Sequence, residues 1–553
     1  MNTNKLSAVI SAKAFREAGG RYVVISPGSR NAPLIKSFQN EDLQLLSIVD
    51  ERSAGFIALG IAQSTGGPVA LCCTSGSALL NYSPAVAEAF YAGINLIVFS
   101  ADRPQEFIDQ GIGQTIQQQG VYQNFQKGFL QLPLDVLNEN LLFEEISCLL
   151  EKGKQGFKGP IHVNIPFDEP LYGEAKFLAL EDRSSNDENA RGFNSLSETL
   201  LAEFYSTRRV LIICGVLAPS SELNEALDSI SRLSNIALFS EYTSNLSISH
   251  TIKTIDRVLE LSGDSDEPDL VITLGENIIS KKIKSFVSSS NAKHWHVNEG
   301  GIGRDIFGKL SETINANAGD FLNSLNTNKQ KIDSGYKANW ENKRLLSQRR
   351  HDQYFGNCVY SDLYVFEQIV NVLPSNYHIQ SGNSSVVRYF QLFDNLNSKS
   401  FYANRGTSGI DGSTSTAVGF CHVVDEPTLL VTGDLSFMYD SNGLWNNIVS
   451  AKLRIIIINN AGGGIFRIIP GPDTVENFET FFEGNHSMNF RGIIENMSLD
   501  YGLAKNESDL NHALQTFFDA SDVAKVLEVQ TPNEINSRIL KEYFSFIKNG
   551  DHA

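Results

Sequence analysis

The stretch from Thr428 to Phe466, TLLVTGDLSFMYDSNGLWNNIVSAKLRIIIINNAGGGIF, decides the fold of this chain. Two apolar runs within it, TLLVT at 428–432 and RIIII at 454–458, have the length of strands. Continuous apolar strands of this kind are typical of parallel sheets that are buried on both faces. Each run ends in a polar loop that contains glycine or asparagine. The stretch therefore predicts two parallel strands with a ligand site beyond their carboxyl ends.

An earlier stretch has the same layout. LCCTSGSALLNYSPAVAEAFYAGINLIVFSADRP at 71–104 again gives a strand, a glycine loop, a helix, a strand and a polar loop. Further strand-like runs are Tyr22–Ser26, Val69–Cys73, Asn95–Ser100, Val210–Cys214 and Leu270–Leu274. Alternation of such runs with helix-length segments predicts an α/β fold built from several doubly wound parallel sheets. The shared layout indicates two related domains, although α/β sequences without common origin produce the same pattern.

Two stretches interrupt this alternation and suggest domain boundaries. Glu181–Arg191, EDRSSNDENAR, has no apolar residue except one alanine and predicts a linker. Asn326–Gln353 is charged and predicts a connector that contains a helix. We therefore expect three domains, at about residues 1–180, 192–325 and 355–553.

Composition excludes several classes of protein. The 553 residues carry a formal net charge of −18, so a nucleic-acid partner is not expected. No apolar run approaches the ~20 residues that cross a bilayer. Residues 1–20 predict an amphipathic helix rather than a secretory signal, and we expect a cytoplasmic protein. The six cysteines contain no CxxC pair and the ten histidines no HExxH spacing, so neither disulfides nor a zinc site are predicted.

The strongest chemical signal is a possible magnesium site. Asp434 follows Gly433 at the end of one strand, and Asn460 follows the next strand 26 residues later. The carboxyl ends of neighbouring parallel strands meet at one sheet edge, so these side chains should lie together. Carboxylate, amide and peptide oxygens, here from Asp434, Asn460 and Gly462, suit Mg²⁺, and a diphosphate would complete the octahedron. An isolated aspartate at this place is otherwise an ordinary turn residue.

The setting makes this signal more specific. GDLSFMYDSNGL followed by IIIINNAGGGIF resembles the diphosphate-binding motif of thiamine diphosphate enzymes, with Leu435 where the commonest form has glycine. The resemblance implies three domains of that enzyme type and a thiamine diphosphate held through Mg²⁺, with Mn²⁺ as an alternative ion. It implies cofactor contacts from Pro27, Glu51, Ser408, Ile410, Gly433, Asp434, Leu435, Ser436, Asn460, Gly462, Gly463 and Ile465.

Glu51 is the candidate catalytic acid. Enzymes of this class need a carboxyl group that hydrogen-bonds N1′ of the aminopyrimidine, which lets the cofactor's own amino group remove the C2 proton. Glu51 follows a strand and precedes the helix SAGFIALGIAQ, and we expect it to be buried with a raised pKa. The alternative is a first-turn helix carboxylate. Ile410 is the candidate support for the bent cofactor; its alternative is a core residue.

A closer resemblance covers the first and third domains. SPGSRNAP (26–33), VDERSAGFIALG (49–60), TSGSA (74–78), SADRP (100–104), GNSSVVR (382–388), NRGTSGIDG (404–412), GDLS (433–436) and NNAGGGIF (459–466) occur in this order. Together they resemble the menaquinone-pathway family of 2-succinyl-5-enolpyruvyl-6-hydroxy-3-cyclohexene-1-carboxylate synthases. The family resemblance implies decarboxylation of 2-oxoglutarate and 1,4-addition of the succinyl-semialdehyde carbanion to isochorismate.

This reaction needs an unusual number of cations. Both substrates are dianions, so the site has to hold up to four carboxylates. The resemblance implies that Ser384 and Arg388 hold 2-oxoglutarate, and that Ile465 and Phe466 form an apolar wall. For isochorismate and proton transfer it implies Ser29, Arg30, Arg103, Gln114 and Arg405.

Two positions depart from the family pattern. Lys281 and Lys282 stand where the family has a Lys-Arg pair that reaches the substrate, and lysine cannot form the bidentate contact of arginine. Gly113 stands before Gln114 where the family often has asparagine, which weakens the assignment of Gln114.

Two other functions remain open from the sequence. One is another thiamine diphosphate carboligase or decarboxylase of the acetolactate synthase type, against which the arginine-containing loops argue. The other is a non-catalytic α/β binding protein, against which Glu51, Asp434 and Asn460 argue. Because the family shares each site between two chains, the resemblance implies a homodimer or a tetramer of two such dimers.

Overall fold

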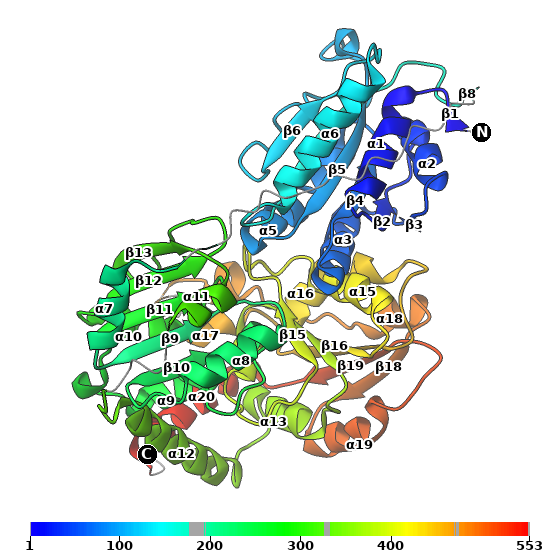
Figure 1. The fold of residues 1–553 in the computed structure, drawn as a ribbon. Helices are drawn as coiled ribbons and strands as arrows, with labels where there is room; N and C mark the ends of the chain where they lie inside the picture. Colours follow the sequence, from blue (N-terminus) through cyan, green and yellow to red (C-terminus); the bar gives the residue numbers. More distant parts are fainter. Residues whose placement is uncertain are drawn as a thin grey trace.

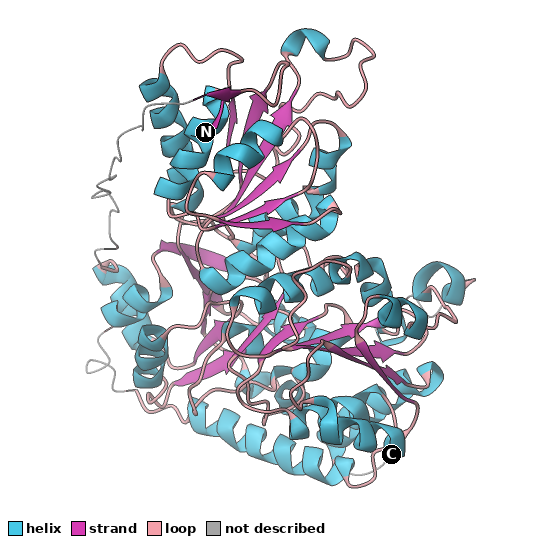
Figure 2. Cartoon of the chain, turned by 90° about the vertical axis from the view of Figure 1, so that its right-hand side faces the viewer, coloured by secondary structure: helices cyan, strands magenta, loops and turns pink. Residues whose placement is uncertain are grey.

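Three parallel sheets organise the chain, one in each predicted domain. The computed structural model describes residues 2–175, 193, 195–325, 332–468, 471 and 475–550. The first domain stands above the other two, whose sheets lie beside each other (Figure 1). In the view turned by 90°, helices cover both faces of the sheets (Figure 2). The predicted α/β fold is confirmed.

The first sheet has six parallel strands in the order β3-β2-β4-β5-β7-β6. Its strands are β2 (Tyr22–Ile25), β3 (Gln44–Ser47), β4 (Val69–Cys73), β5 (Leu96–Asp102), β6 (Gly128–Gln131) and β7 (Ile161–Pro166). Its main helices are α1 (Leu6–Glu17), α2 (Ala32–Gln39), α3 (Glu51–Thr65), α4 (Ser77–Asn81), α5 (Ser83–Ala92) and α6 (Glu139–Lys154). The short strands β1 (Asn2–Thr3) and β8 (Glu174–Ala175) pair antiparallel beside it.

The third sheet repeats this topology. Its order is β15-β14-β16-β17-β19-β18, so both sheets place their strands in the sequence second, first, third, fourth, sixth, fifth. The strands are β14 (His378–Ser381), β15 (Ser400–Ala403), β16 (Thr428–Gly433), β17 (Leu453–Asn459), β18 (Asp500–Ala504) and β19 (Lys525–Gln530). Its helices are α13 (Asp362–Val372), α14 (Ser385–Phe390), α15 (Ser413–Val423), α16 (Asp434–Tyr439), α17 (Ile465–Ile468), α18 (Arg491–Asn496), α19 (Glu507–Phe517) and α20 (Asn533–Asn549). The shared order supports the prediction of two related domains.

The middle sheet has five parallel strands in the order β10-β9-β11-β12-β13. They are β9 (Val210–Cys214), β10 (Ile236–Ser240), β11 (Leu270–Leu274), β12 (Lys293–Asn298) and β13 (Leu310–Asn315). The helices are α7 (Glu198–Ser206), α8 (Ser221–Ile230), α9 (Ile255–Val258), α10 (Lys281–Ser289) and α11 (Ala318–Ser324). Both β9 and β11 are fully buried, as their continuous apolar sequences predict.

The predicted connector contains the helix α12 (Tyr336–Phe355). Trp340 of this helix is buried against Phe239 of the middle domain, and His351 accepts or donates a hydrogen bond at 2.8 Å to Tyr543 of α20. The helix α12 therefore packs against both the middle and the third domain. The predicted linker Glu181–Arg191 lies outside the described residues, so the domain boundaries stay a prediction.

The first and third domains meet through α3 and α15, which pack very closely. A Cβ atom built on Gly60 would lie 2.0 Å from the carbonyl oxygen of Thr416, and one on Gly419 would lie 2.1 Å from that of Ile57. Only glycine permits such an approach between the two backbones. None of the described helices is both long and apolar enough to cross a membrane.

Candidate active site

The predicted magnesium residues lie together at the carboxyl edge of the third sheet. Asp434 is only 2% exposed, and its Oδ2 accepts a hydrogen bond of 3.0 Å from the amide of Gly462. Asn460 is buried, and its Nδ2 donates at 3.0 Å to Asp362 of α13. A Cβ on Gly433 would meet no atom within 4 Å, so open space lies in front of this residue. A buried carboxylate beside an open glycine fits a metal ion with a bound diphosphate.

Two neighbours of this edge were missed by the sequence analysis. His486 lies with its Nε2 3.1 Å from Oδ2 of Asp434. Asp362 is fully buried, and burial raises its pKa to about 6 against the effect of its hydrogen bonds from Thr531 and Asn460. Neither residue stands in the quoted motifs, because both reach the edge from other elements.

Glu51 is the first residue of α3, but it does not cap the helix. The cap is Asp50, whose side chain accepts from the amides of Arg52 and Ser53. The carboxylate of Glu51 instead accepts a hydrogen bond of 3.3 Å from Asn81. Glu51 is partly exposed, so the expectation of burial is wrong for the single chain. It stands in the first turn of a helix at the edge of its sheet, where solvent still reaches it.

The start of α3 lies against the third domain. The Arg52 guanidinium donates to the carbonyl oxygen of Tyr439 at 2.6 Å, and Asn442 donates to Asp50 at 2.7 Å. Tyr439 is the last residue of α16, which begins at Asp434, and Asn442 follows shortly after this helix. The structure therefore brings the first turn of α3 next to the helix that carries the diphosphate motif.

The loop 404–412 completes this edge. Ser408 adopts a left-handed φ of 63°, and Ser436 in the first turn of α16 donates to the carbonyl oxygen of Ile410 at 2.6 Å. The Ile410 side chain is 40% exposed, so it is not a core residue. An exposed isoleucine beside an open polar edge is available to support a ligand.

A cavity of about 220 Å³ gathers several predicted substrate residues from two domains. Lys281 and Lys282 of α10 line it from the middle domain, and Arg388 and Ile465 line it from the third. Arg388 donates to the carbonyl oxygen of Ile279 at 3.1 Å, which ties the two sides together. Ser384 has a left-handed φ of 66° immediately before α14, and its neighbour Ser385 lines the cavity.

The two lysines of this cavity are not equivalent. The Nζ of Lys282 pairs with Glu260 and lies 3.3 Å from the centre of the Phe544 ring. Lys281 is exposed and makes neither contact. A substrate carboxylate therefore meets less competition for Lys281 than for Lys282.

The remaining predicted residues stay within the first domain. They share the carboxyl edge of its sheet with Glu51, and they are Pro27, Ser29, Arg30, Arg103 and Gln114. Ser29 shares a hydrogen bond of 2.9 Å with Tyr172, and Arg30 pairs with Glu169 at 3.1 Å. Within the described ranges, no hydrogen bond or ion pair connects these five residues to the cavity at Arg388. Phe466 instead lies beside Phe482, with ring centres 6.3 Å apart.

The loop that contains Gln114 also contains Gln118, and it is Gln118 that is buried. Gln114 is exposed, with a φ of 58°, and only its carbonyl oxygen is held, by Ser75 at 2.9 Å. Gln118 is buried and accepts from the amide of Gly76 at 2.9 Å. Sequence alone offered no signal to prefer one glutamine over the other.

Comparison with known proteins agrees with this geometry. A family model described as the N-terminal binding domain of thiamine pyrophosphate (thiamine diphosphate) enzymes matches residues 7–124. A protein of Flavobacterium johnsoniae is 41% identical over 94% of this chain and 95% of its own length. Relatives from Christiangramia forsetii (39%, 96% of each chain) and Porphyromonas gingivalis (37%, 99% and 98%) are similar over the same extent. All three are named 2-succinyl-5-enolpyruvyl-6-hydroxy-3-cyclohexene-1-carboxylate synthase.

The chain belongs to this synthase family. The predicted family and enzyme class, a thiamine diphosphate-dependent carboligase, are thereby confirmed, as is the three-domain fold of these enzymes. The identities extend through the middle domain, which the quoted motifs did not cover.

This synthase-family chain also has a buried carboxylate near the cations predicted to bind substrate, which the motifs did not reveal. Glu241 follows β10, is 1% exposed, and accepts hydrogen bonds of 2.8 Å from the amides of Ile279 and Ser280. Burial raises its pKa to about 7, while these amides and the charge of Arg405 oppose the rise. Burial lowers the pKa of Lys284, and nearby Arg405, Arg388 and Lys281 lower it further against Glu241. Glu241 directly follows β10, and this position at a strand end is the signal that could have identified it.

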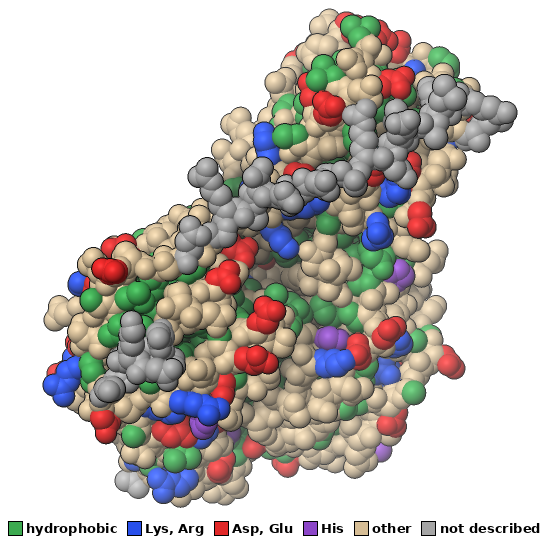
Figure 3. Space-filling view, viewed as in Figure 1, with side chains coloured by type: hydrophobic (Ala, Val, Ile, Leu, Met, Phe, Trp, Pro, Cys, Tyr) green, Lys and Arg blue, Asp and Glu red, His purple; other side chains and the backbone are tan. Residues whose placement is uncertain are grey.

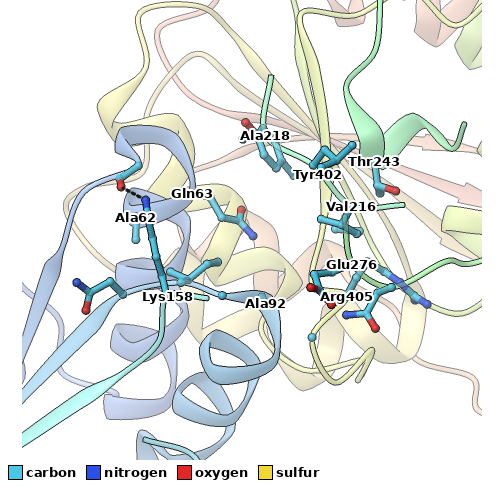
Figure 4. Close-up of a pocket in the computed structure, with 18 of the residues that line it drawn as sticks. Ala62, Gln63, Ala92, Lys158, Val216, Ala218, Thr243, Glu276, Tyr402 and Arg405 are labelled. Carbon is cyan, nitrogen blue, oxygen red and sulfur yellow. Dashed lines mark hydrogen bonds between the residues drawn. The ribbon is translucent and has the colours of Figure 1, made fainter. Parts of the chain in front are cut away.

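A second cavity, of about 200 Å³, lies where the three domains meet (Figure 4). Gln63, Ala92 and Lys158 line it from the first domain; Val216 and Glu276 line it from the middle domain. Arg405 of the third domain also reaches it, and its Nη1 donates to Asn383 at 2.8 Å. Over the visible surface, acidic and basic side chains alternate in all three domains (Figure 3).

Proposed function

We propose that the chain uses thiamine diphosphate and Mg²⁺ to decarboxylate 2-oxoglutarate and to add the remaining four-carbon unit to isochorismate. The product is 2-succinyl-5-enolpyruvyl-6-hydroxy-3-cyclohexene-1-carboxylate, a step of menaquinone biosynthesis. The observation that carries the proposal is the cavity shared by Lys281, Arg388 and Ile465. Cations gathered around one cavity of a chain of net charge −18 are matched to dianionic substrates.

Different residues would hold the diphosphate end and the aminopyrimidine end of the cofactor. Asp434, Asn460 and the carbonyl of Gly462 would bind Mg²⁺, and the open backbone at Gly433 would receive the diphosphate. Ile410 would support the bent cofactor, and Glu51 would hold N1′ of its aminopyrimidine. When bound, thiamine diphosphate supplies the electron sink for decarboxylation and the nucleophilic carbon for the new bond.

The substrate residues divide between the two acids. Arg388, with Ser384, would hold the distal carboxylate of 2-oxoglutarate, and Lys281 lies in the same cavity. Ile465 and Phe466 would exclude water from the reacting carbon, which protects it from protonation. Isochorismate would be held by Ser29, Arg30, Arg103, Gln114 and Arg405.

We further propose a homodimer, or a tetramer of two dimers. Ser29 and Arg30 are held by contacts within their own domain, at 2.9 Å from Ser29 to Tyr172 and 3.1 Å from Arg30 to Glu169. In a dimer, the isochorismate residues of one chain would lie against the cavity at Arg388 of the other chain. An active site completed in this way by the partner is the argument that supports the proposed dimer.

An omission assay tests the proposed function. Isochorismate absorbance is followed with thiamine diphosphate, Mg²⁺ and 2-oxoglutarate, each left out in turn. We expect loss of isochorismate only when all three are present. Cofactor-dependent CO₂ release that ignores isochorismate would indicate a 2-oxoacid decarboxylase, and no cofactor-dependent change would indicate a binding protein.

A further inference from the structure

A buried carboxylate of the first domain contacts the loop that carries Arg405. Glu88 lies in α5 and is 1% exposed. It accepts hydrogen bonds of 2.6 Å from the amide of Gly406, 2.6 Å from the amide of Thr407 and 2.8 Å from the hydroxyl of Thr407. Among the described residues, no cation lies within ion-pair distance of Glu88. A charge buried in this way is stabilised by these donors and by the nearby charge of Arg405.

The backbone of the loop approaches α5 very closely. A Cβ on Gly406 would lie 2.3 Å from the carbonyl oxygen of Glu88 and 3.0 Å from the amide nitrogen of Ala92. The φ of Gly406 is not left-handed, so glycine is required here by the close approach to the helix. This close approach is independent of the three hydrogen bonds and places the same segment directly against α5.

The other side of the loop is held within the third domain. Asn383 donates at 2.7 Å to the carbonyl oxygens of Asn404 and Gly409, and accepts at 2.8 Å from Arg405. The segment that bears Arg405 and Ile410 is thus fixed between Glu88 and Asn383. A variant that releases one side leaves Arg405 with a wider range of positions.

We propose that Glu88 is a positioning residue, which holds the 404–412 loop so that Arg405 meets the isochorismate carboxylate. The inference rests on the proposed function. A buried apolar residue would pack at this place without the cost of a buried charge, but it would not fix the two amides. Glu88 therefore fixes the position of the 404–412 loop rather than adding to the stability of the folded chain.

The test is a double-mutant cycle that combines Glu88→Gln with Arg405→Ala. In Glu88→Gln the side chain keeps its size, but its NH₂ group faces a backbone N–H. One of the two hydrogen bonds from the amides of Gly406 and Thr407 is therefore lost. We expect the KM for isochorismate to rise ~10-fold, with the KM for 2-oxoglutarate changed less than ~3-fold. In Arg405→Ala, adding Glu88→Gln should cause no further increase. Glu41→Gln, which alters a first-domain carboxylate paired with Arg16, is the matched control and should leave both values unchanged.

Hydrogen exchange gives a readout that needs no substrate. The amides of Gly406 and Thr407 should exchange faster in Glu88→Gln than in the native chain, and Thr407→Val, which removes only the hydroxyl contact, should show a smaller effect. Thr407→Val also serves if Glu88→Gln does not fold. Unchanged exchange of these two amides in Glu88→Gln would overturn the positioning role of Glu88. So would additive effects of Glu88→Gln and Arg405→Ala on the KM for isochorismate. Absence of isochorismate consumption by the native chain would overturn the proposed function but leave the exchange test intact.

Discussion

Neighbouring acidic residues at one helix start serve different purposes. Asp50 caps α3 through the amides of Arg52 and Ser53, so Glu51 is released from that role. Glu51 is left with one contact, to Asn81, at a place where its helix abuts Tyr439. A carboxylate that is not needed for the fold is suited to a chemical role.

Glu51→Gln tests this assignment. The amide keeps the shape but cannot hold N1′ in the same way, so kcat should fall by ~10²-fold or more, while Mg²⁺–diphosphate affinity stays within ~2-fold. Steady-state kinetics and titration calorimetry measure the two quantities. Asp50→Asn is the control for an altered helix start. An unchanged kcat in Glu51→Gln would remove the N1′ role.

Arg388→Ala tests the assignment of the substrate pocket. Loss of a charged hydrogen-bond donor costs ~2 kcal/mol, so the KM for 2-oxoglutarate should rise ~30-fold, and that for isochorismate much less. Lys282→Ala is the contrasting variant, because its ammonium is already engaged by Glu260 and Phe544. It should change either KM by less than ~3-fold. The opposite ranking of the two substrates for Arg388→Ala would show that the pockets are exchanged.

At the scale of elements, the packing of α3 on α15 joins the first and third domains. Gly419→Ala would drive a methyl group against the carbonyl oxygen of Ile57 and should destabilise the chain by ~2 kcal/mol or more. Gly492→Ala in α18 meets no atom within 4 Å and should be neutral or stabilising by ~0.5 kcal/mol. Urea unfolding measures both. Equal stability of the two variants would mean that the helices do not pack as described.

Asp440 joins the start of α15 to the end of α16 and makes stability depend on pH. It is buried and accepts from the amide and the hydroxyl of Ser415 at 2.6 and 2.7 Å. Burial raises its pKa from 3.8 to about 7, against these bonds and Arg52. The folded state therefore binds more protons, and the contribution of Asp440 to stability falls as pH rises from ~4 to ~7 and is constant above.

Asp440→Asn should remove this slope. Between pH 5 and pH 8 the native chain should lose on the order of 2 kcal/mol more unfolding free energy than the variant. Urea denaturation of both proteins at several pH values gives the difference directly. Parallel pH profiles would show that Asp440 does not titrate in this range.

At the scale of the whole molecule, sequence predicted what depends on continuous local pattern. Val210–Cys214 and Leu270–Leu274 are strands with the predicted bounds, because they are buried throughout and apolar except for Thr273. Asp434 and Asn460 came together because neighbouring parallel strands end at one edge. The two strands were predicted to be neighbours because one follows the other along the chain, and their pairing in the sheet confirms this.

Long-range contacts explain what sequence did not predict. Glu88 binds amides 318 and 319 residues away, and Glu241 binds amides 38 and 39 residues away. Backbone amides carry no side-chain signature, so no motif announces such partners. The half-exposure of Glu51 was likewise missed, because burial at the edge of a sheet depends on what covers that edge.

The predicted assembly is tested in solution. Light scattering on the eluted protein should give the mass of a dimer or a tetramer, and dilution below the dissociation range should reduce activity together with mass. A monomer of 61.0 kDa with full activity would contradict a site completed by the partner chain.

The central claim is that one site couples loss of CO₂ from 2-oxoglutarate to addition onto isochorismate. The most direct measurement is the ratio of labelled CO₂ released from carboxyl-labelled 2-oxoglutarate to isochorismate consumed, with thiamine diphosphate and Mg²⁺ present. The account predicts equal amounts, and a rate of CO₂ release that rises when isochorismate is added. Release of CO₂ at the same rate without isochorismate, with no isochorismate consumed, would contradict it.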